Sequence, residues 1–164
     1  MKSKRILAFG HFPKEFGGKQ SSGLSFVMHA LFKGINNCNN NFEYWFAATD
    51  FKDSFKNIEK KIIGWSLISL LKYLFHKPWL ILYYILKSIK LFLKFRLSIP
   101  NSFFKLIFYD KSINEYKPDL LHLHGCHSVI FFELYNFNAY KAIITIHGIT
   151  GFDTNLPKYK YLRK

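Results

Sequence analysis

The stretch Lys4-Arg5-Ile6-Leu7-Ala8-Phe9-Gly10 is a short apolar run that ends in glycine, which is typical of a buried β-strand. Farther along, residues 24–32 have the apolar periodicity of a helix that Gly34 would close, and residues 42–49 have the composition of a second strand. The apolar face predicted for the helix consists of Leu24, Val27, Met28 and Leu31. The order strand, helix, strand predicts a βαβ unit.

The last third of the chain has the same organisation. Residues 120–125 and 141–148 are two further apolar runs that end in glycine, and residues 127–140 between them are compatible with a helix. Continuous apolar strands separated by helices are typical of a parallel sheet that is covered on both faces. We therefore expect an α/β fold with a Rossmann-like, doubly wound parallel sheet.

The middle of the chain breaks this pattern, so we expect a single domain over residues 1–164 with a helical insertion at residues 51–116. The apolar run 62–75 contains a single charged residue, the run 79–86 contains none, and Pro78 lies between them as a helix breaker. Neither run reaches the roughly 18–20 uncharged apolar residues that a membrane-spanning helix needs.

The helix predicted beyond Pro78 has two different faces. One face carries Lys87, Lys90 and Lys94, and another carries Leu82, Leu86, Ile89 and Leu93. This pattern is typical of an amphipathic helix that lies in a membrane interface. The alternative is a helical hairpin that packs on the protein's own sheet and leaves its lysines in solvent.

Composition excludes several classes of protein. Of the 164 residues, 49% are apolar and 20% are aromatic, so the chain can bury enough surface to offset its ordering entropy and is not disordered. Two cysteines, Cys38 and Cys126, exclude a disulfide framework and are compatible with a reducing compartment. Residues 6–10 are too short for the apolar region of a secretory signal, so we expect a cytoplasmic protein.

The charge balance points to a partner. The chain has 24 Lys and Arg against 10 Asp and Glu, a formal net charge of +14. Its basic residues punctuate long apolar stretches and do not form a nucleic-acid-binding module, so the expected partner is an anionic membrane surface and not nucleic acid. We expect a peripheral location on the inner face of the cell membrane.

Three predicted strand ends pair glycine with histidine: Gly10-His11, His124-Gly125 and His147-Gly148. Ligands of open parallel sheets bind beyond the carboxyl ends of the strands. Glycine lets a ligand approach the backbone, and histidine offers a hydrogen bond or a base near neutral pH. Gly17 and Gly18 precede a predicted helix N-terminus, which favours an anion such as a phosphate, although their spacing matches no dinucleotide or P-loop fingerprint.

Four segments of the chain, in this order, resemble the N-terminal, acceptor-side domain of the family 4 glycosyltransferases, which are retaining enzymes of the GT-B fold. They are residues 5–10, the Gly17-Gly18 loop, Pro118-Asp119-Leu120-Leu121-His122-Leu123-His124-Gly125, and Thr145-Ile146-His147-Gly148. The resemblance implies transfer of a sugar, a hexosyl group, from a nucleotide-sugar donor to a glycan acceptor that is lipid-linked or belongs to the cell envelope.

The resemblance also implies roles for individual residues. Gly17 and Gly18 would lie near the donor phosphates and the acceptor, and His147 would contact the donor sugar or its phosphate as the catalytic residue. The further substrate-binding residues would be His124, Gly125, Thr145 and Gly148. The family pattern implies no metal and no cofactor besides the nucleotide sugar.

The chain departs from this family in one large respect. Family members have a second Rossmann-like domain that binds most of the nucleotide and carries a Glu-x7-Glu motif, and the sequence to Lys164 contains neither. We therefore expect a truncated product, or an acceptor-side subunit that needs a separate donor-binding subunit.

Two alternatives remain. His122, His124, Cys126 and His127 resemble the His-x-His-x-Asp-His run of metallo-β-lactamase-type hydrolases, with cysteine in the place of aspartate. Histidines at i and i+2 of a strand point to one side, and Cys and His suit zinc, so a zinc hydrolase fragment is the second hypothesis. The third is a non-catalytic module that binds the membrane surface.

Overall fold

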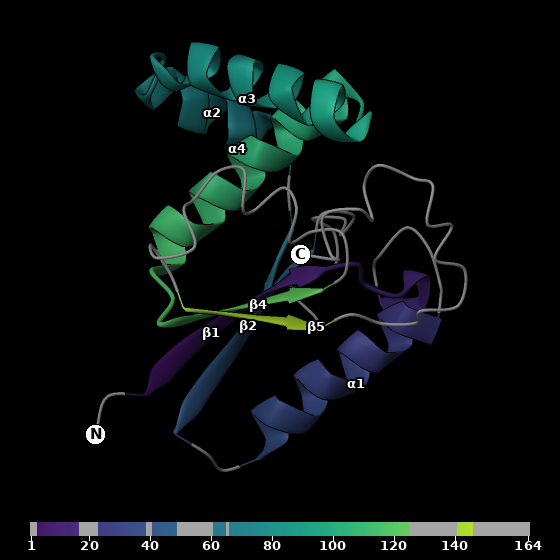
Figure 1. The fold of residues 1–164 in the computed structure, drawn as a ribbon. Helices are drawn as coiled ribbons and strands as arrows, with labels where there is room; N and C mark the ends of the chain where they lie inside the picture. The colour runs from purple at the N-terminus through teal and green to yellow at the C-terminus, as the bar shows by residue number, and fades with distance from the viewer. Residues whose placement is uncertain are drawn as a thin grey trace.

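The computed structural model describes residues 3–16, 23–38, 41–48, 61–64, 66–124 and 141–145. They form an α/β fold with one parallel sheet and helices on both of its faces, which confirms the expected Rossmann-like class (Figure 1). The strands are β1 (Lys4–Gly10), β2 (Phe42–Ala48), β3 (Ile62–Ile63), β4 (Leu120–His124) and β5 (Ala142–Thr145). The helices are α1 (Gly23–Asn37), α2 (Leu67–His76), α3 (Leu80–Phe95) and α4 (Ile99–Tyr116), with a short 3-10 turn at Lys14–Phe16.

The described residues contribute five strands to the sheet, in the order β3-β2-β1-β4-β5. β1 lies in the centre and pairs in parallel with β2 on one side and with β4 on the other. The predicted βαβ unit is therefore confirmed as β1-α1-β2. β3 was not expected as a strand: the apolar run assigned to residues 62–75 divides into this edge strand and α2.

α1 differs from its prediction in two respects. It continues past Gly34 to Asn37, so Gly34 does not close it. The predicted apolar face is confirmed at Met28 and wrong at Val27 and Leu31, which are exposed, while the side chain of Leu24 lies outside the described residues. The side chains of α1 that are buried against the sheet are Ser25, Met28, His29 and Phe32. The helix is turned relative to the predicted face because the ring of Phe16, before the helix, stacks on His29 with 3.8 Å between ring centroids.

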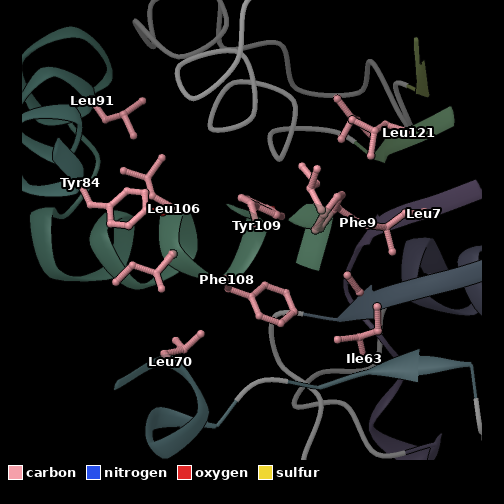
Figure 2. Packing of buried hydrophobic residues seen from close by; sticks show 14 of the residues in the cluster. Leu7, Phe9, Ile63, Leu70, Tyr84, Leu91, Leu106, Phe108, Tyr109 and Leu121 are labelled. Atoms are coloured by element: carbon pink, nitrogen blue, oxygen red, sulfur yellow. The ribbon is translucent and has the colours of Figure 1, made fainter. Parts of the chain in front are cut away.

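Successive side chains of a strand point to opposite faces, and the two faces of the sheet bury different clusters. On one face, Ala8, Tyr44 and Phe46 pack with Met28 and Phe32 of α1. On the other face, Leu7, Phe9, Leu121 and Leu123 pack with α4 (Figure 2). The joint between sheet and α4 is aromatic: the rings of Phe9 and Tyr109 meet edge to face with centroids 4.4 Å apart, and both residues are fully buried.

Asp119, in the Pro-Asp pair before β4, fastens that strand to β1. The Arg5 amide donates to the Asp119 carboxylate over 2.8 Å, and the Asp119 amide donates to the Arg5 carbonyl over 2.9 Å. This reciprocal pair sets the register in which Ile6 lies opposite Leu120. Asp119, which the sequence analysis named only as part of the family resemblance, therefore has a structural role here.

Gly10 likewise has a packing reason. A Cβ built on Gly10 would lie 1.7 Å from the Met28 methyl carbon and 3.3 Å from the Phe46 ring. The space beside this glycine is filled by α1, which gives Gly10 a packing role, while its expected contact with a ligand stays a prediction.

The described part of the expected insertion contains three helices. α4 covers the sheet, while α2 and α3 lie beyond α4 on the side away from the sheet (Figure 1). One carboxylate holds the three together: Asp110 of α4 accepts from Tyr73 of α2 over 2.7 Å and from Tyr84 of α3 over 2.5 Å. Leu70 and Leu74 of α2 are buried in the hydrophobic cluster that contains the apolar side chains of α4, which adds apolar packing to these hydrogen bonds.

Candidate functional site

The carboxyl ends of the strands meet at one edge of the sheet because all five strands are parallel. Thr145 lies directly opposite His124 in the β4–β5 register, and Phe9 lies opposite Leu123. The structure therefore brings together two of the predicted substrate-binding residues, His124 and Thr145, beside the end of β1.

A polar row crosses the α1 face of the sheet just before this edge. The Tyr44 hydroxyl lies 2.7 Å from Nδ1 of His122, and Nε2 of His122 lies 2.7 Å from the Thr145 hydroxyl. Tyr44 belongs to β2 and His122 to β4, so this hydrogen bond spans the central strand β1. Ala8 is the β1 residue opposite His122, and its small side chain leaves room for the tyrosine to reach across.

Both ring nitrogens of His122 are occupied by hydroxyl groups, which can each donate or accept. The two hydroxyl groups therefore fix the orientation of the ring. Burial raises the pKa of Tyr44, which keeps its hydroxyl protonated. Tyr44 was not predicted from the sequence. The signal that could have found it is a tyrosine in a buried strand whose neighbouring strand carries a small residue, here Ala8.

The side chain of His124 is almost fully buried and does not lie on the surface. Its side chain is 2% exposed, and its ring is 4.1 Å from that of His122 between centroids, with the planes tilted by 40°. The two histidines point to the same side of β4, as their i, i+2 spacing predicted. Thr145 is half-buried and is the more accessible member of the predicted pair.

Several predicted site residues lie outside the described residues. They are Gly17, Gly18, Gly125, His147 and Gly148 of the sugar-transfer hypothesis, and Cys126 and His127 of the zinc hypothesis. The helix expected over residues 127–140 lies there as well.

The zinc hypothesis depends on Cys126 and His127, which lie outside the described residues, so it stays a prediction. Within the described ranges, no group of three or more His, Cys, Asp or Glu side chains is placed to hold a metal ion. His122 would also have to give up a hydroxyl partner before either ring nitrogen could bind a metal.

A second candidate surface lies on α2 and α3. The stripe of α3 that packs on α4 consists of Tyr84, Ser88, Leu91 and Phe95. At 100° per residue, the opposite stripe consists of Leu82, Leu86, Ile89 and Leu93, and all four side chains are exposed. On α2, Leu67, Ile68, Leu71 and Phe75 are also exposed, Phe75 to 85%, as is Trp79 between the helices. We call these exposed side chains the outer apolar surface.

Basic residues flank the outer apolar surface. Lys87, Lys90 and Lys94 share one flank of α3, between its buried and its exposed stripe. Two of them rest on aromatic rings, Lys87 at 5.5 Å from the Tyr83 centroid and Lys94 at 5.0 Å from that of Phe95. No acidic residue occurs between Glu59 and Asp110, so every charged residue of this stretch is Lys or Arg.

None of the helices in the described part of the chain combines the length and the apolarity that crossing a membrane requires. The outer apolar surface therefore belongs to helices that are too short or too charged to span a bilayer.

The fold and the site together define the class: an α/β protein with a Rossmann-like parallel sheet, a histidine-bearing carboxyl edge and an apolar, basic outer helix pair. Comparisons of this chain with protein-family models, with curated proteins and with solved structures found no match.

Proposed function

We propose that this chain is a cytoplasmic protein, peripheral on the inner face of the cell membrane, and that it supplies the acceptor side of a sugar-transfer site. A donor-binding domain, as a separate subunit, would bind most of the nucleotide. The acceptor would be a glycan that is lipid-linked or belongs to the cell envelope, because such a molecule resides where the outer apolar surface would hold the protein.

The observation that supports the sugar-transfer part is the pairing of His124 with Thr145 at the carboxyl edge of the sheet. Edges of this kind are where open α/β sheets bind their ligands. A threonine hydroxyl and an imidazole can hydrogen-bond to sugar hydroxyls and phosphate oxygens. In this proposal His147 is the catalytic residue, and Gly17, Gly18, Gly125 and Gly148 contribute backbone contacts.

Hydrogen exchange tests this part. UDP-glucose, UDP-N-acetylglucosamine and GDP-mannose are the probes, and we expect one of them to slow exchange of the β4 and β5 amides. His147→Ala should abolish that protection without changing the free energy of unfolding, while Cys38→Ser, at an exposed position of the chain, should leave it intact. Because the separate subunit would bind most of the nucleotide, the probes are used at millimolar concentration, where the chain alone is expected to contact their sugar and phosphate groups. If no probe alters exchange at β4 or β5 under these conditions, the sugar-transfer part is wrong and the non-catalytic membrane module remains.

The observation that supports the membrane part is the exposure of Leu82, Leu86 and Leu93 on the side of α3 that faces away from α4. Contiguous exposed apolar surface marks a protein or membrane interaction site. The lysine flank beside it favours an anionic bilayer, where apolar side chains enter the interface and ammonium groups meet lipid phosphates.

Vesicle flotation tests this part. The protein should float with phosphatidylglycerol-containing vesicles at low salt, and less so as salt screens the attraction. The triple variant with Lys87→Glu, Lys90→Glu and Lys94→Glu should bind more weakly by roughly 1 kcal/mol per residue. The matched control carries the same charge change at exposed lysines on other elements, Lys33→Glu, Lys117→Glu and Lys141→Glu. Equal flotation of the two triple variants would contradict the proposed orientation.

A further variant separates apolar insertion from charge. Leu82→Ser, Leu86→Ser and Leu93→Ser together should abolish flotation and leave the free energy of unfolding nearly unchanged, because these side chains are already in solvent. Loss of stability without loss of flotation would show that the outer stripe packs within the protein.

A further inference from the structure

A cavity of about 530 Å³ lies between α2 and the C-terminal half of α4, outside the sheet edge described above. The described lining has three basic side chains, three hydroxyl groups, one carboxylate and one apolar side chain. In chain order these residues are Ser66, Ile68, Ser69, Lys72, Tyr73, His76, Lys111 and Glu115. All the α2 members lie on one flank of that helix, next to the outer apolar surface.

The cavity has a surplus of positive charge. Lys72 is exposed, and its ammonium group makes no hydrogen bond or ion pair with the described residues. Lys111 is three-quarters or more buried and donates to Glu115 over 2.8 Å. The Glu115 carboxylate therefore already neutralises one of the two lysine ammonium groups at the cavity wall. Among the described residues, the ammonium group of Lys72, which faces the same space, then has no counter-charge, and such a group attracts an anion.

His76 has a fixed orientation at the cavity wall. Its Nδ1 lies 2.8 Å from the Lys72 carbonyl oxygen, which can only accept, so Nδ1 carries a proton and donates. Nε2 is thereby directed away from the helix backbone. This ring is positioned for a second contact and does not swing freely in solvent.

Tyr73, which lines the cavity, takes part in a hydrogen-bond network between α2 and α4. The Tyr73 hydroxyl donates to Asp110 over 2.7 Å and accepts from Lys77 over 3.3 Å. Asp110 itself is not among the described residues that line the cavity. The network joins α2 to α4, which makes the two walls of the cavity one unit.

Ile68 connects the cavity to the outer apolar surface. It lines the cavity and is 68% exposed, and it shares a helix face with Leu71 and Phe75. A ligand with a charged group and an apolar part could therefore place the first in the cavity and the second along α2.

We infer that this cavity binds an organic phosphate, with Lys72 and Lys111 as the principal contacts and His76 and Ser69 as hydrogen-bonding partners. Lysine is a common point-charge partner of phosphate, and the volume lies in the range of small-molecule sites. The phosphate could belong to an anionic lipid headgroup or to a soluble phosphate ester. The lipid source rests on the peripheral location proposed above, whereas the soluble source does not.

The first experiment titrates the purified full chain with inorganic phosphate and with glycerol 3-phosphate at constant ionic strength, followed by amide chemical shifts of α2. We expect saturable shifts at Ser69 and Lys72. Lys72→Gln and Lys111→Gln should each weaken binding about 10-fold. Lys141→Gln removes the same charge at an exposed position beside β5 and should have no effect.

The second experiment compares flotation of these variants with vesicles of phosphatidylcholine alone and with added phosphatidylglycerol. A larger loss for Lys72→Gln than for Lys141→Gln assigns the site to a lipid headgroup. Equal losses, together with selective phosphate binding in the first experiment, assign it to a soluble ester. If the wild-type chain binds phosphate but does not float, the membrane proposal fails and the cavity assignment stands. If Lys72→Gln and Lys141→Gln behave alike with every probe, the cavity is not a phosphate site.

Discussion

The sheet and the α2–α3 pair distribute their polar and apolar side chains in opposite ways. The sheet buries His124 almost completely, while α2 leaves Phe75 85% exposed. Neighbouring strands also supply hydroxyl partners to the half-buried His122, as Tyr44 and Thr145 do. The helix pair leaves apolar surface exposed because α4 covers one stripe of α3 and the opposite stripe has no described neighbour. Residue type alone therefore does not determine burial in this protein.

The difference matters for function, because the two regions would recognise different chemistry. The sheet edge offers a few directional hydrogen-bonding groups, on His122, His124 and Thr145, which are half-buried or buried. The outer apolar surface offers area and positive charge without directional partners, which suits a bilayer better than a defined small molecule.

The largest contrast should appear on truncating one phenylalanine in each region. Phe9→Ala should lower the free energy of unfolding by about 3–5 kcal/mol, because it removes a fully buried ring that packs on Tyr109. Phe75→Ala should change it by less than about 0.5 kcal/mol. Urea denaturation followed by circular dichroism measures both, and Phe9→Leu replaces Phe9→Ala if the latter does not fold. Similar losses for Phe9→Ala and Phe75→Ala would contradict the described burial.

The next effect concerns the attachment of the helix pair. Asp110→Ala should destabilise the protein by about 3 kcal/mol, since it leaves the buried Tyr84 hydroxyl and the Tyr73 hydroxyl without their carboxylate acceptor. Hydrogen exchange should accelerate in α2 and α3 more than in β1. Asp110→Asn keeps an acceptor oxygen and serves as the control with a smaller loss. Uniform acceleration across the sheet and the helix pair would mean that Asp110 does not act locally.

The smallest effect concerns the polar row across the sheet. Tyr44→Phe should cost about 1–2 kcal/mol at neutral pH, because Nδ1 of His122 loses its hydroxyl partner.

The same variant has a pH signature. Burial raises the pKa of Tyr44 above its ordinary value of 10.0, so the folded state keeps a proton that the unfolded state releases above that pH. The contribution is fully present below pH 10 and is lost as pH rises, and the wild-type unfolding free energy should fall there more steeply than that of Tyr44→Phe. Tyr83→Phe, at an exposed tyrosine, is the control and should keep the steep fall. Parallel curves for the wild type and Tyr44→Phe would contradict the raised pKa.

Much of the fold could be predicted from local pattern. β1 occupies the predicted residues 4–10, and the described residues of β2 and β4 all lie within the predicted strands 42–49 and 120–125. Apolar runs bounded by glycine are strong signals because a parallel strand is buried on both faces. Part of the face of α1 was wrong because the rings of Phe12 and Phe16, which precede that helix, pack against His29, and no periodicity within residues 24–32 contains that contact.

The candidate site was predictable in its position and not in its detail. Parallel strands bring their carboxyl ends to one edge whatever their side chains, so His124 and Thr145 could be expected to be neighbours. Register was needed to show that Tyr44 reaches His122 across Ala8, and packing was needed to show that Met28 occupies the space beside Gly10.

The sequence by itself determined β1, α1, β2 and β4, the parallel sheet and the two faces of α3, because these follow from periods of about 2 and 3.6 residues along the chain, whereas the short strand β3 was missed. Tertiary structure decided which stripe of α3 is covered, which partners the histidines meet and where a basic cavity forms between α2 and α4. These depend on contacts between residues far apart in the chain, and local pattern carries no information about which distant side chains will meet.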